Sequence, residues 1–331
     1  MSDMTIQVNN LSRDFVYYEK ESGLKGSVKN LFKRRKKIRH AVRDVSFGIN
    51  SGEIVGFIGP NGAGKSTTLK MLSGILHPTS GTALVNGYVP WERKEAFKRS
   101  FSFVAGQRSQ LWTDLPAIES LYLNKCIYEI PDDDYNATIK ELTEMLNVTE
   151  FLKVQVRRLS LGERMKMELI ASLLHKPSVF FLDEPTIGLD VLSQQAIRNY
   201  LKEYNKKMGA TIILTSHYTK DIEELCDHTI IINKGKKVYD GNINDLRRMQ
   251  SDNKVVNLTL PKIAEREEFE KYGEITSCEK NKIAIELGSS KIGAVLPVIL
   301  QNHDISDFSV EDLSLEKSIS SIFASSDTDE T

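Results

Sequence analysis

A glycine-rich stretch constrains this chain more than any other part of its sequence. It reads Gly59-Pro60-Asn61-Gly62-Ala63-Gly64-Lys65-Ser66-Thr67 and satisfies the pattern GxxxxGK[ST]. The apolar run at residues 54–58 is typical of a short buried strand, and the pattern at residues 68–72 is typical of a helix. Strand, loop and helix in this order are the context that a phosphate-binding loop requires.

The composition of this loop follows from its chemistry. Successive backbone N–H groups must converge on phosphate oxygens, so glycine is needed wherever a β-carbon would block the approach. The helix that follows offers its positive N-terminal end to the same anion. We therefore expect residues 59–67 to hold a nucleotide, with Lys65 reaching the β- and γ-phosphates and Ser66 ligating Mg²⁺.

A second apolar run, residues 179–182, ends in two adjacent carboxylates, Asp183 and Glu184. In an open α/β sheet such a strand end lies at the crevice where ligands bind, beside the phosphate loop. Asp183 is then placed to hold Mg²⁺ through water. Glu184 is placed to polarise the attacking water as a general base.

Ser160 and Gly162 stand at the start of a long helical pattern and make a second end that can bind an anion. Alone, this arrangement is an ordinary helix cap. Its position about twenty residues upstream of the strand that ends in Asp183 gives it more weight.

Composition excludes several classes of protein. A formal net charge of −1 over 331 residues argues against a dedicated nucleic-acid binder. The three cysteines are scattered without CxxC spacing, which indicates neither a zinc site nor a disulfide framework and favours a reducing cytosol. No signal peptide is visible, and no apolar run approaches the ~20 residues of a membrane span. A transport role would therefore need a separate membrane partner.

The pattern along the chain predicts two domains. The first covers residues 1–248 and includes a basic insertion at about residues 19–40. The second covers residues 249–331 and ends in an acidic tail. Strands are expected at residues 4–18, 41–50, 54–58, 179–182, 210–214, 230–239 (a hairpin), 255–260 and 282–287. Residues 92–159 are expected to be mainly helical, and further helices are expected at residues 265–272, 292–301 and 315–323. Apolar strands between helices favour a parallel sheet covered on both faces in the first domain, followed by a small α+β domain.

Together these motifs resemble the ABC ATPase family over about residues 4–245. The resemblance implies a P-loop NTPase fold of ABC ATPase type, with a RecA-like core, an antiparallel β subdomain and a helical subdomain. It identifies residues 59–67 as Walker A, Asp183 and Glu184 as Walker B with its catalytic glutamate, and residues 160–163 as the signature loop that meets ATP on a second subunit.

The resemblance also implies roles for three further positions and one short loop. Gln107 is similar to the Q-loop glutamine that contacts the metal and γ-phosphate, and His217 to the switch histidine. Residues 187–190 resemble the D-loop. Phe15 best matches the aromatic residue that stacks on adenine, with Tyr17 and Tyr18 as alternatives.

Two features depart from the family pattern. The signature loop reads Leu159-Ser160-Leu161-Gly162-Glu163 instead of LSGGQ, which adds bulk and a negative charge. The basic insertion has Val28, Leu31 and Phe32 at helical spacing where relatives have a short turn. It is interpreted either as a solvated surface insertion or as a contact with anionic lipid or a permease.

The resemblance implies an ATPase that uses ATP and Mg²⁺, acts as a dimer with an identical or related subunit, and binds a separately encoded transmembrane permease at the cytoplasmic face of the membrane. Within the family, the chain looks most like drug-resistance exporters of the daunorubicin-resistance type. Two alternatives remain: a soluble ABC protein of ribosomes or DNA, and an inactive regulatory ATPase. A single ATPase motif set and the lack of a heptad array argue against the first.

Overall fold

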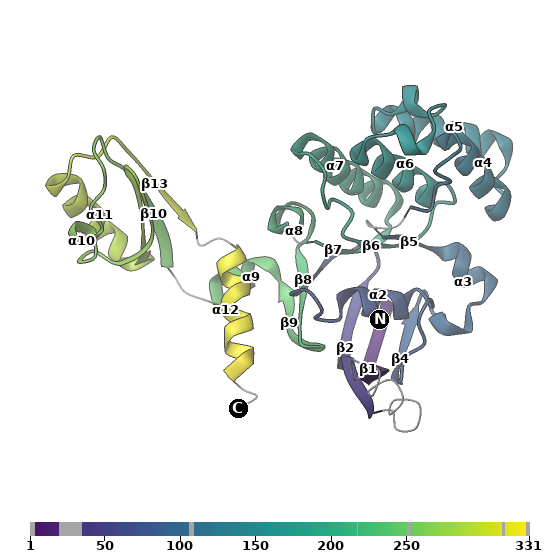
Figure 1. Ribbon diagram of the computed structural model, residues 1–331, viewed down its shortest axis with the longest axis horizontal. Helices are drawn as coiled ribbons and strands as arrows, with labels where there is room; N and C mark the ends of the chain where they lie inside the picture. The colour runs from purple at the N-terminus through teal and green to yellow at the C-terminus, as the bar shows by residue number, and fades with distance from the viewer. Residues whose placement is uncertain are drawn as a thin grey trace, which may run out of the picture. The chain divides into compact units, whose positions relative to one another are not determined.

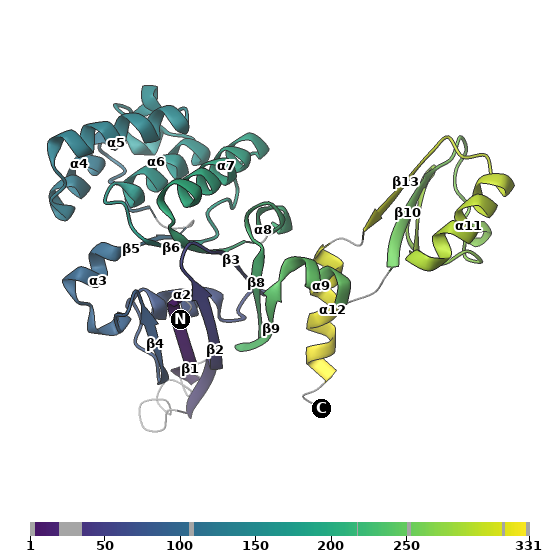
Figure 2. The ribbon, with the colours of Figure 1, turned by 180° about the vertical axis from the view of Figure 1, so that it is seen from behind.

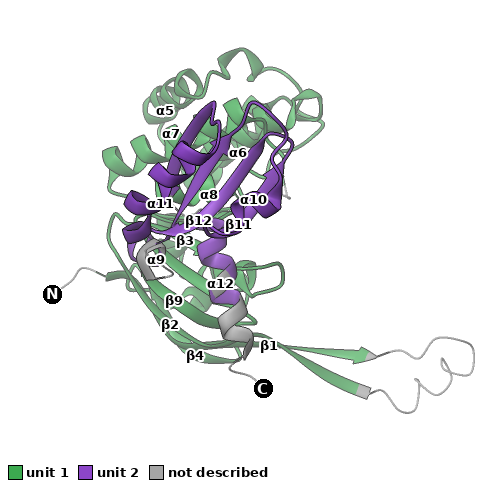
Figure 3. Cartoon of the chain, turned by 90° about the vertical axis from the view of Figure 1, so that its left-hand side faces the viewer, with its two compact units in different colours: residues 1–241 green, residues 242–331 purple. Residues whose placement is uncertain are grey.

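The computed structural model describes residues 4–19, 35–105, 109–216, 218–249, 253–312 and 315–328. The chain divides into two compact units, residues 1–241 and 242–331 (Figure 3). The boundary expected after residue 248 falls inside helix α9 (Ile243–Met249). The predicted roles of Gln107 and His217, and the helical spacing around Leu31, lie outside the described residues.

A six-stranded sheet forms the centre of the first unit, in the order β5-β6-β7-β3-β8-β9. Its strands are β3 (Ile54–Ile58), β5 (Phe101–Ala105), β6 (Val179–Asp183), β7 (Thr211–Thr215), β8 (His228–Asn233) and β9 (Lys236–Asn242). Strands β5, β6, β7, β3 and β8 pair in parallel. Nearly every residue of β3, β6 and β7 is buried, as expected for strands covered on both faces.

Residues 92–159 are mainly helical, as expected, but they also contain strand β5, which was not predicted. Ser102 and Val104 are buried while their neighbours are half-buried, which is the alternation of a strand near the edge of a sheet. The run is short and apolar, and such runs cannot be assigned from periodicity alone. The hairpin predicted at Lys234-Gly235 is confirmed, since both residues adopt positive φ between β8 and β9.

Helices cover both faces of this sheet (Figure 1, and from behind in Figure 2). On one side lie α4 (Ala117–Tyr128), α5 (Asp132–Met145), α6 (Leu161–Leu173) and α7 (Val191–Met208), with α8 (Thr219–Leu225) near β8. On the other side lie α2 (Lys65–Leu72), the short α3 (Glu95–Ser100) and an antiparallel sheet. Buried side chains from α2 and from both sheets form one continuous apolar core.

The antiparallel sheet has the order β2-β1-β4, with β1 (Met4–Glu19), β2 (Arg35–Asn50) and β4 (Ser80–Val85). Strand β2 begins six residues before the expected start at Ala41, so residues 35–40 of the basic insertion are strand. Their alternation was masked by lysines and arginines, which pair in register with residues 14–19 of β1. Strand β4 pairs with β1 only as far as Ser12.

The second unit contains a four-stranded antiparallel sheet in the order β11-β12-β10-β13. The chain runs β10 (Asn253–Thr259), α10 (Arg266–Phe269), β11 (Glu274–Glu279), β12 (Lys282–Gly288), α11 (Ser289–Asn302) and β13 (Asp307–Asp312). This βαββαβ order is the ferredoxin-like arrangement. Buried side chains of β10 and β12, with Phe269 and Ile299, form its core. Helices α9 and α12 (Leu315–Thr328) contact each other.

Candidate functional site

The phosphate-binding loop joins β3 to α2 as the sequence predicts. Gly64 precedes the helix with φ of 111°, and a β-carbon there would lie 2.5 Å from the Ala41 carbonyl oxygen, so only glycine fits. Lys65 is 5% exposed. Its Nζ donates to the carbonyl oxygens of Gly59 at 2.6 Å and Pro60 at 3.2 Å. The loop thus holds a buried ammonium group against its own backbone.

Two carboxylates face the lysine from the end of β6. Burial lowers the pKa of Lys65, while the charges of Glu184 and Asp183 act to raise it. The Lys65 ammonium group is therefore partly desolvated and lies near the negative charges of Glu184 and Asp183. Such an environment strengthens the interaction with an incoming anion, because the effective dielectric constant is lower than in water.

Asp183 is the meeting point of three elements. Its Oδ1 accepts hydrogen bonds from Ser66 Oγ of α2 and from Thr215 Oγ1 of β7, each at 2.9 Å. Hydroxyl and carboxylate oxygens are among the ligands that Mg²⁺ prefers. Within the described residues no cluster of three or more His, Cys, Asp or Glu side chains surrounds a metal site. The pair of Ser66 and Asp183 therefore suits a Mg²⁺ ion that also takes phosphate and water ligands.

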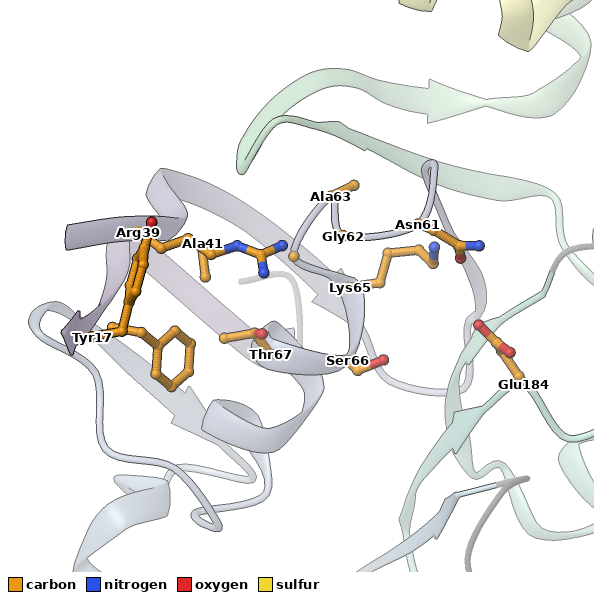
Figure 4. A pocket seen from close by; sticks show the side chains of 12 residues that line it. Tyr17, Arg39, Ala41, Asn61, Gly62, Ala63, Lys65, Ser66, Thr67 and Glu184 are labelled. Atoms are coloured by element: carbon orange, nitrogen blue, oxygen red, sulfur yellow. The ribbon is translucent and has the colours of Figure 1, made fainter. Parts of the chain in front are cut away.

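Glu184 adopts an unusual backbone conformation, with φ of 58°. Its N–H donates to both the Thr215 carbonyl oxygen and Oγ1, at 3.2 and 3.0 Å, which fixes the chain there. A left-handed conformation costs a residue other than glycine about 1–3 kcal/mol, and such conformations cluster at functional sites. The turn carries the carboxylate to the pocket, across from Lys65 and Asn61 (Figure 4).

These groups line one pocket of about 550 Å³. Its walls come from the phosphate loop, Glu184, and the paired strands β1 and β2: Phe15, Tyr17, Arg39, Ala41, residues 61–67 and Glu184. Of the three aromatic candidates for adenine, Phe15 and Tyr17 line this pocket and Tyr18 is absent from its described lining. The pocket is large enough for a nucleotide.

Arg39 is a residue of this pocket that the sequence did not reveal. It pairs across the strands with Phe15, and its side chain extends toward the phosphate loop (Figure 4). A β-carbon placed on Gly62 would lie only 3.1 Å from its Nη2. In the described part of the chain no carboxylate forms an ion pair with Arg39. Only the strand register, which puts Arg39 and Ala41 on the same face of β2, could have identified it.

The N-terminus of α6 is capped by the side chains of Ser160 and Glu163. Ser160 Oγ accepts from the Glu163 N–H at 3.3 Å, and the Glu163 carboxylate accepts from the Ser160 N–H at 2.8 Å. This is a capping box, which explains the unusual glutamate in the signature loop. Neither Ser160 nor Gly162 is among the described residues that line the pocket.

Gly162 packs directly against the start of α7. A β-carbon at Gly162 would lie 2.6 Å from Ser193 Oγ. Ser193 in turn donates, through both its N–H and its hydroxyl, to the carboxylate of Asp190 at 2.9 and 2.7 Å. The signature loop and the end of the predicted D-loop are therefore in close contact within one chain.

Two buried acids organise the loops around this site and were missed by the sequence reading. Glu168 of α6 accepts from the Ser109 hydroxyl and the Gln110 N–H, and burial raises its pKa. Asp221 of α8 accepts from the hydroxyls of Thr186 and Ser216. Glu168 thus holds the chain just after position 107, and Asp221 holds it just before position 217.

Comparison with known proteins gives matches over both units. The family model described as ABC transporter matches residues 42–187, and the model described as EvrA-like ABC transporter, C-terminal domain, matches residues 252–311. The chain is similar to the ABC transporter ATP-binding protein NatA of Bacillus subtilis (strain 168), with 32% identity over 65% of this chain and 87% of that protein.

Two further matches agree with these. The linearmycin resistance ATP-binding protein LnrL of Bacillus subtilis (strain 168) is 34% identical over 68% of this chain and 71% of that protein. A solved structure titled as the ATP binding subunit of an ABC transporter superposes with a TM-score of 0.62 at 27% identity. The match covers 74% of this chain and 92% of that one.

Proposed function

The chain belongs to the family of ABC transporter ATP-binding proteins, and from this premise we propose that it drives a separately encoded permease in an exporter. As a member of this family it is an ATPase that binds ATP. The observation that carries the proposal is that Lys65, Ser66 and Glu184 line one pocket, with Asp183 hydrogen-bonded to Ser66. No helix in the described residues is long and apolar enough to span a bilayer.

We assign the phosphates of ATP to the loop of residues 59–67. The adenine ring is assigned to the side of the pocket formed by Phe15 and Tyr17. Lys65 already lies beside the loop carbonyls and needs only a change of rotamer to meet the β- and γ-phosphates. Phe15 and Tyr17 present rings on which adenine can stack. Binding would replace the two contacts of the ammonium with neutral carbonyl oxygens by contacts with negatively charged phosphate oxygens, which are stronger.

Ser66 and Asp183 would hold Mg²⁺, which when bound neutralises charge on the phosphates. Gln107 is proposed to share this ion and His217 to contact the γ-phosphate; both lie outside the described residues. Glu184 is the proposed general base that takes a proton from the attacking water. Its left-handed backbone aims the carboxylate into the pocket.

A second ATPase subunit, identical or related, would complete the site. Ser160 and Gly162 of that subunit would approach the γ-phosphate with a helix N-terminus, which favours negative charge. Docking has to compete with the capping box, because Glu163 already uses the Ser160 N–H. The permease is expected to meet the surface near Trp112 and Pro116, and the protein is accordingly proposed to act at the cytoplasmic face of the membrane.

Replacing Lys65 with alanine is expected to weaken ATP binding by about tenfold or more, because charge-assisted hydrogen bonds contribute about 1.5–3 kcal/mol each. Isothermal titration calorimetry with Mg²⁺ and ATP measures this. Lys70→Ala changes a lysine of the same helix that does not line the pocket, and is the matched control. Equal affinity of wild type and Lys65→Ala would place the nucleotide elsewhere.

Replacing Arg39 with glutamine is expected to weaken ATP binding by about 5- to 30-fold, since one exposed charge-assisted contact is worth about 1–2 kcal/mol. The effect should be much smaller for adenosine, which has no phosphate to meet the guanidinium. Lys37→Gln is the control, because Lys37 is the next residue on the same face of β2 but does not line the pocket. An equal loss for ATP and adenosine would contradict a phosphate contact.

The transport half of the proposal needs the permease itself. The tagged chain is purified from native membranes in detergent, and the integral membrane protein that accompanies it is reconstituted with it in vesicles. ATP turnover is expected to rise in the reconstituted complex and to stay at the background level with Lys65→Ala. Turnover that is identical with and without every co-purifying membrane protein would support a non-transport ATPase instead.

A further inference from the structure

Strands β1 and β2 continue beyond the antiparallel sheet as a two-stranded ribbon. The third strand, β4, stops pairing at Ser12, whereas β1 and β2 remain paired to Glu19 and Arg35. Figure 3 shows the two strands running together away from the rest of the first unit. An isolated two-stranded ribbon is marginally stable in water, so its faces need something to pack against.

The two faces of this ribbon differ in what they contact. Phe15, Tyr17 and Arg39 point to the nucleotide pocket. The opposite face, which we call the outer face, carries the cross-strand pairs of Val16 with Ile38 and of Tyr18 with Lys36. Alternation along the strands keeps these four residues together. The outer face therefore has no part in lining the pocket.

The outer face is apolar and exposed. Val16 is 49% exposed, Tyr18 51% and Ile38 50%. Val16 and Ile38 lie directly opposite each other, so their side chains form one continuous apolar surface instead of two isolated ones. Exposed apolar surface bordered by polar groups marks an interaction site more often than a single exposed side chain does.

Positive charge gathers on the same segment. Residues 20–39 contain nine lysines and arginines and one glutamate, although the whole chain has a net charge of −1. Lys36 stands on the outer face itself, opposite Tyr18. Apolar and tyrosine side chains next to lysines are the composition of surfaces that insert shallowly among lipid headgroups, where the rings lie in the interface and the cations meet anionic lipid.

We propose that the outer face of the ribbon docks on the surface of a membrane that contains anionic lipids. The Val16–Ile38 pair enters the headgroup region, and Lys36 with its basic neighbours meets lipid phosphates. A bilayer surface suits this face better than one protein partner does, because it offers diffuse negative charge to Lys36 beside the apolar pair without requiring matched geometry. The inference goes beyond ATP hydrolysis and does not depend on it.

The test is sedimentation of the purified full-length chain with vesicles. One set is phosphatidylcholine, and the other contains about one third phosphatidylglycerol. Wild type is expected to bind the anionic vesicles, to bind the neutral ones weakly, and to be released by high salt. The double variant Val16→Ser/Ile38→Ser is expected to bind anionic vesicles at least about tenfold more weakly than wild type, because apolar area contributes to binding.

Ile75→Ser is the matched control, since Ile75 is an exposed isoleucine of the same unit outside the ribbon, and it should bind as wild type does. ATP affinity of the double variant reports whether the pocket side of the ribbon remains folded. With that affinity intact, unchanged vesicle binding overturns the proposal. Failure of wild type to bind anionic vesicles, or binding only in the presence of the permease, also overturns it. Glu184→Gln should bind vesicles normally, which separates this result from the ATPase assignment.

Discussion

Replacing Glu184 with glutamine is expected to leave ATP binding nearly unchanged while lowering turnover by about 10²–10⁴-fold. The amide keeps the size of the side chain but cannot accept the proton of the attacking water. ATP should then persist between the two subunits, so the variant is also expected to form a stable dimer in ATP. Phosphate release measures turnover, and light scattering with size-exclusion chromatography measures the dimer.

Glu141→Gln gives the matched control for this change. Glu141 lies on α5, where it forms a surface ion pair with Lys207, and neither residue lines the pocket, so turnover should be that of wild type. Hydrolysis by Glu184→Gln at more than about one tenth of the wild-type rate would remove Glu184 from the role of base. A variant that fails to bind ATP would instead indicate a role in forming the pocket.

Replacing Arg198 with methionine is expected to destabilise the first unit by about 3–5 kcal/mol. Arg198 is 1% exposed and donates to Asp221, which is 0% exposed, at 2.7 Å. Removing the guanidinium leaves a buried carboxylate without its main partner. Both tryptophans of the chain, Trp91 and Trp112, belong to the first unit, so denaturant unfolding followed by their fluorescence reports its stability.

A double-variant cycle separates the ion pair from simple loss of packing. Arg198→Met with Asp221→Asn removes both charges, and the double variant should be less destabilised than the sum of the two single ones. Arg157→Met is the contrasting control, because its partner Asp114 is 79% exposed and surface pairs contribute about 0–1 kcal/mol. Strict additivity of the two single effects would show that the two charges are not coupled.

The parts of the fold that could be predicted from the sequence are those whose chemistry is local. The phosphate loop requires its glycines and lysine in one short stretch, and the strand ending in Asp183 carries its own apolar run. The predicted ABC ATPase fold is confirmed by the family match and by the superposition on a solved ATP-binding subunit. The small α+β domain at the C-terminal end of the chain was also predicted, from its alternating apolar residues.

What could not be predicted depends on contacts between distant segments. Strand β13 is mostly exposed, and β11 buries one apolar residue, Ile275, so neither has the alternation that identifies a strand. Arg39 enters the pocket only because β2 pairs with β1 in one particular register. Thr215 and Asp221 act through hydrogen bonds to groups more than thirty residues away. No local motif encodes such partners.

The contact between Gly162 and Ser193 has a consequence for communication inside a dimer. Because no space remains for even a methyl group, a displacement of the tip of α6 toward Ser193 pushes on the start of α7, and with it on Asp190. In the proposed dimer, a nucleotide of the neighbouring subunit that pressed on that tip would also displace residues 187–190 of this chain. That contact would let one subunit of the proposed dimer respond mechanically to nucleotide bound by the other.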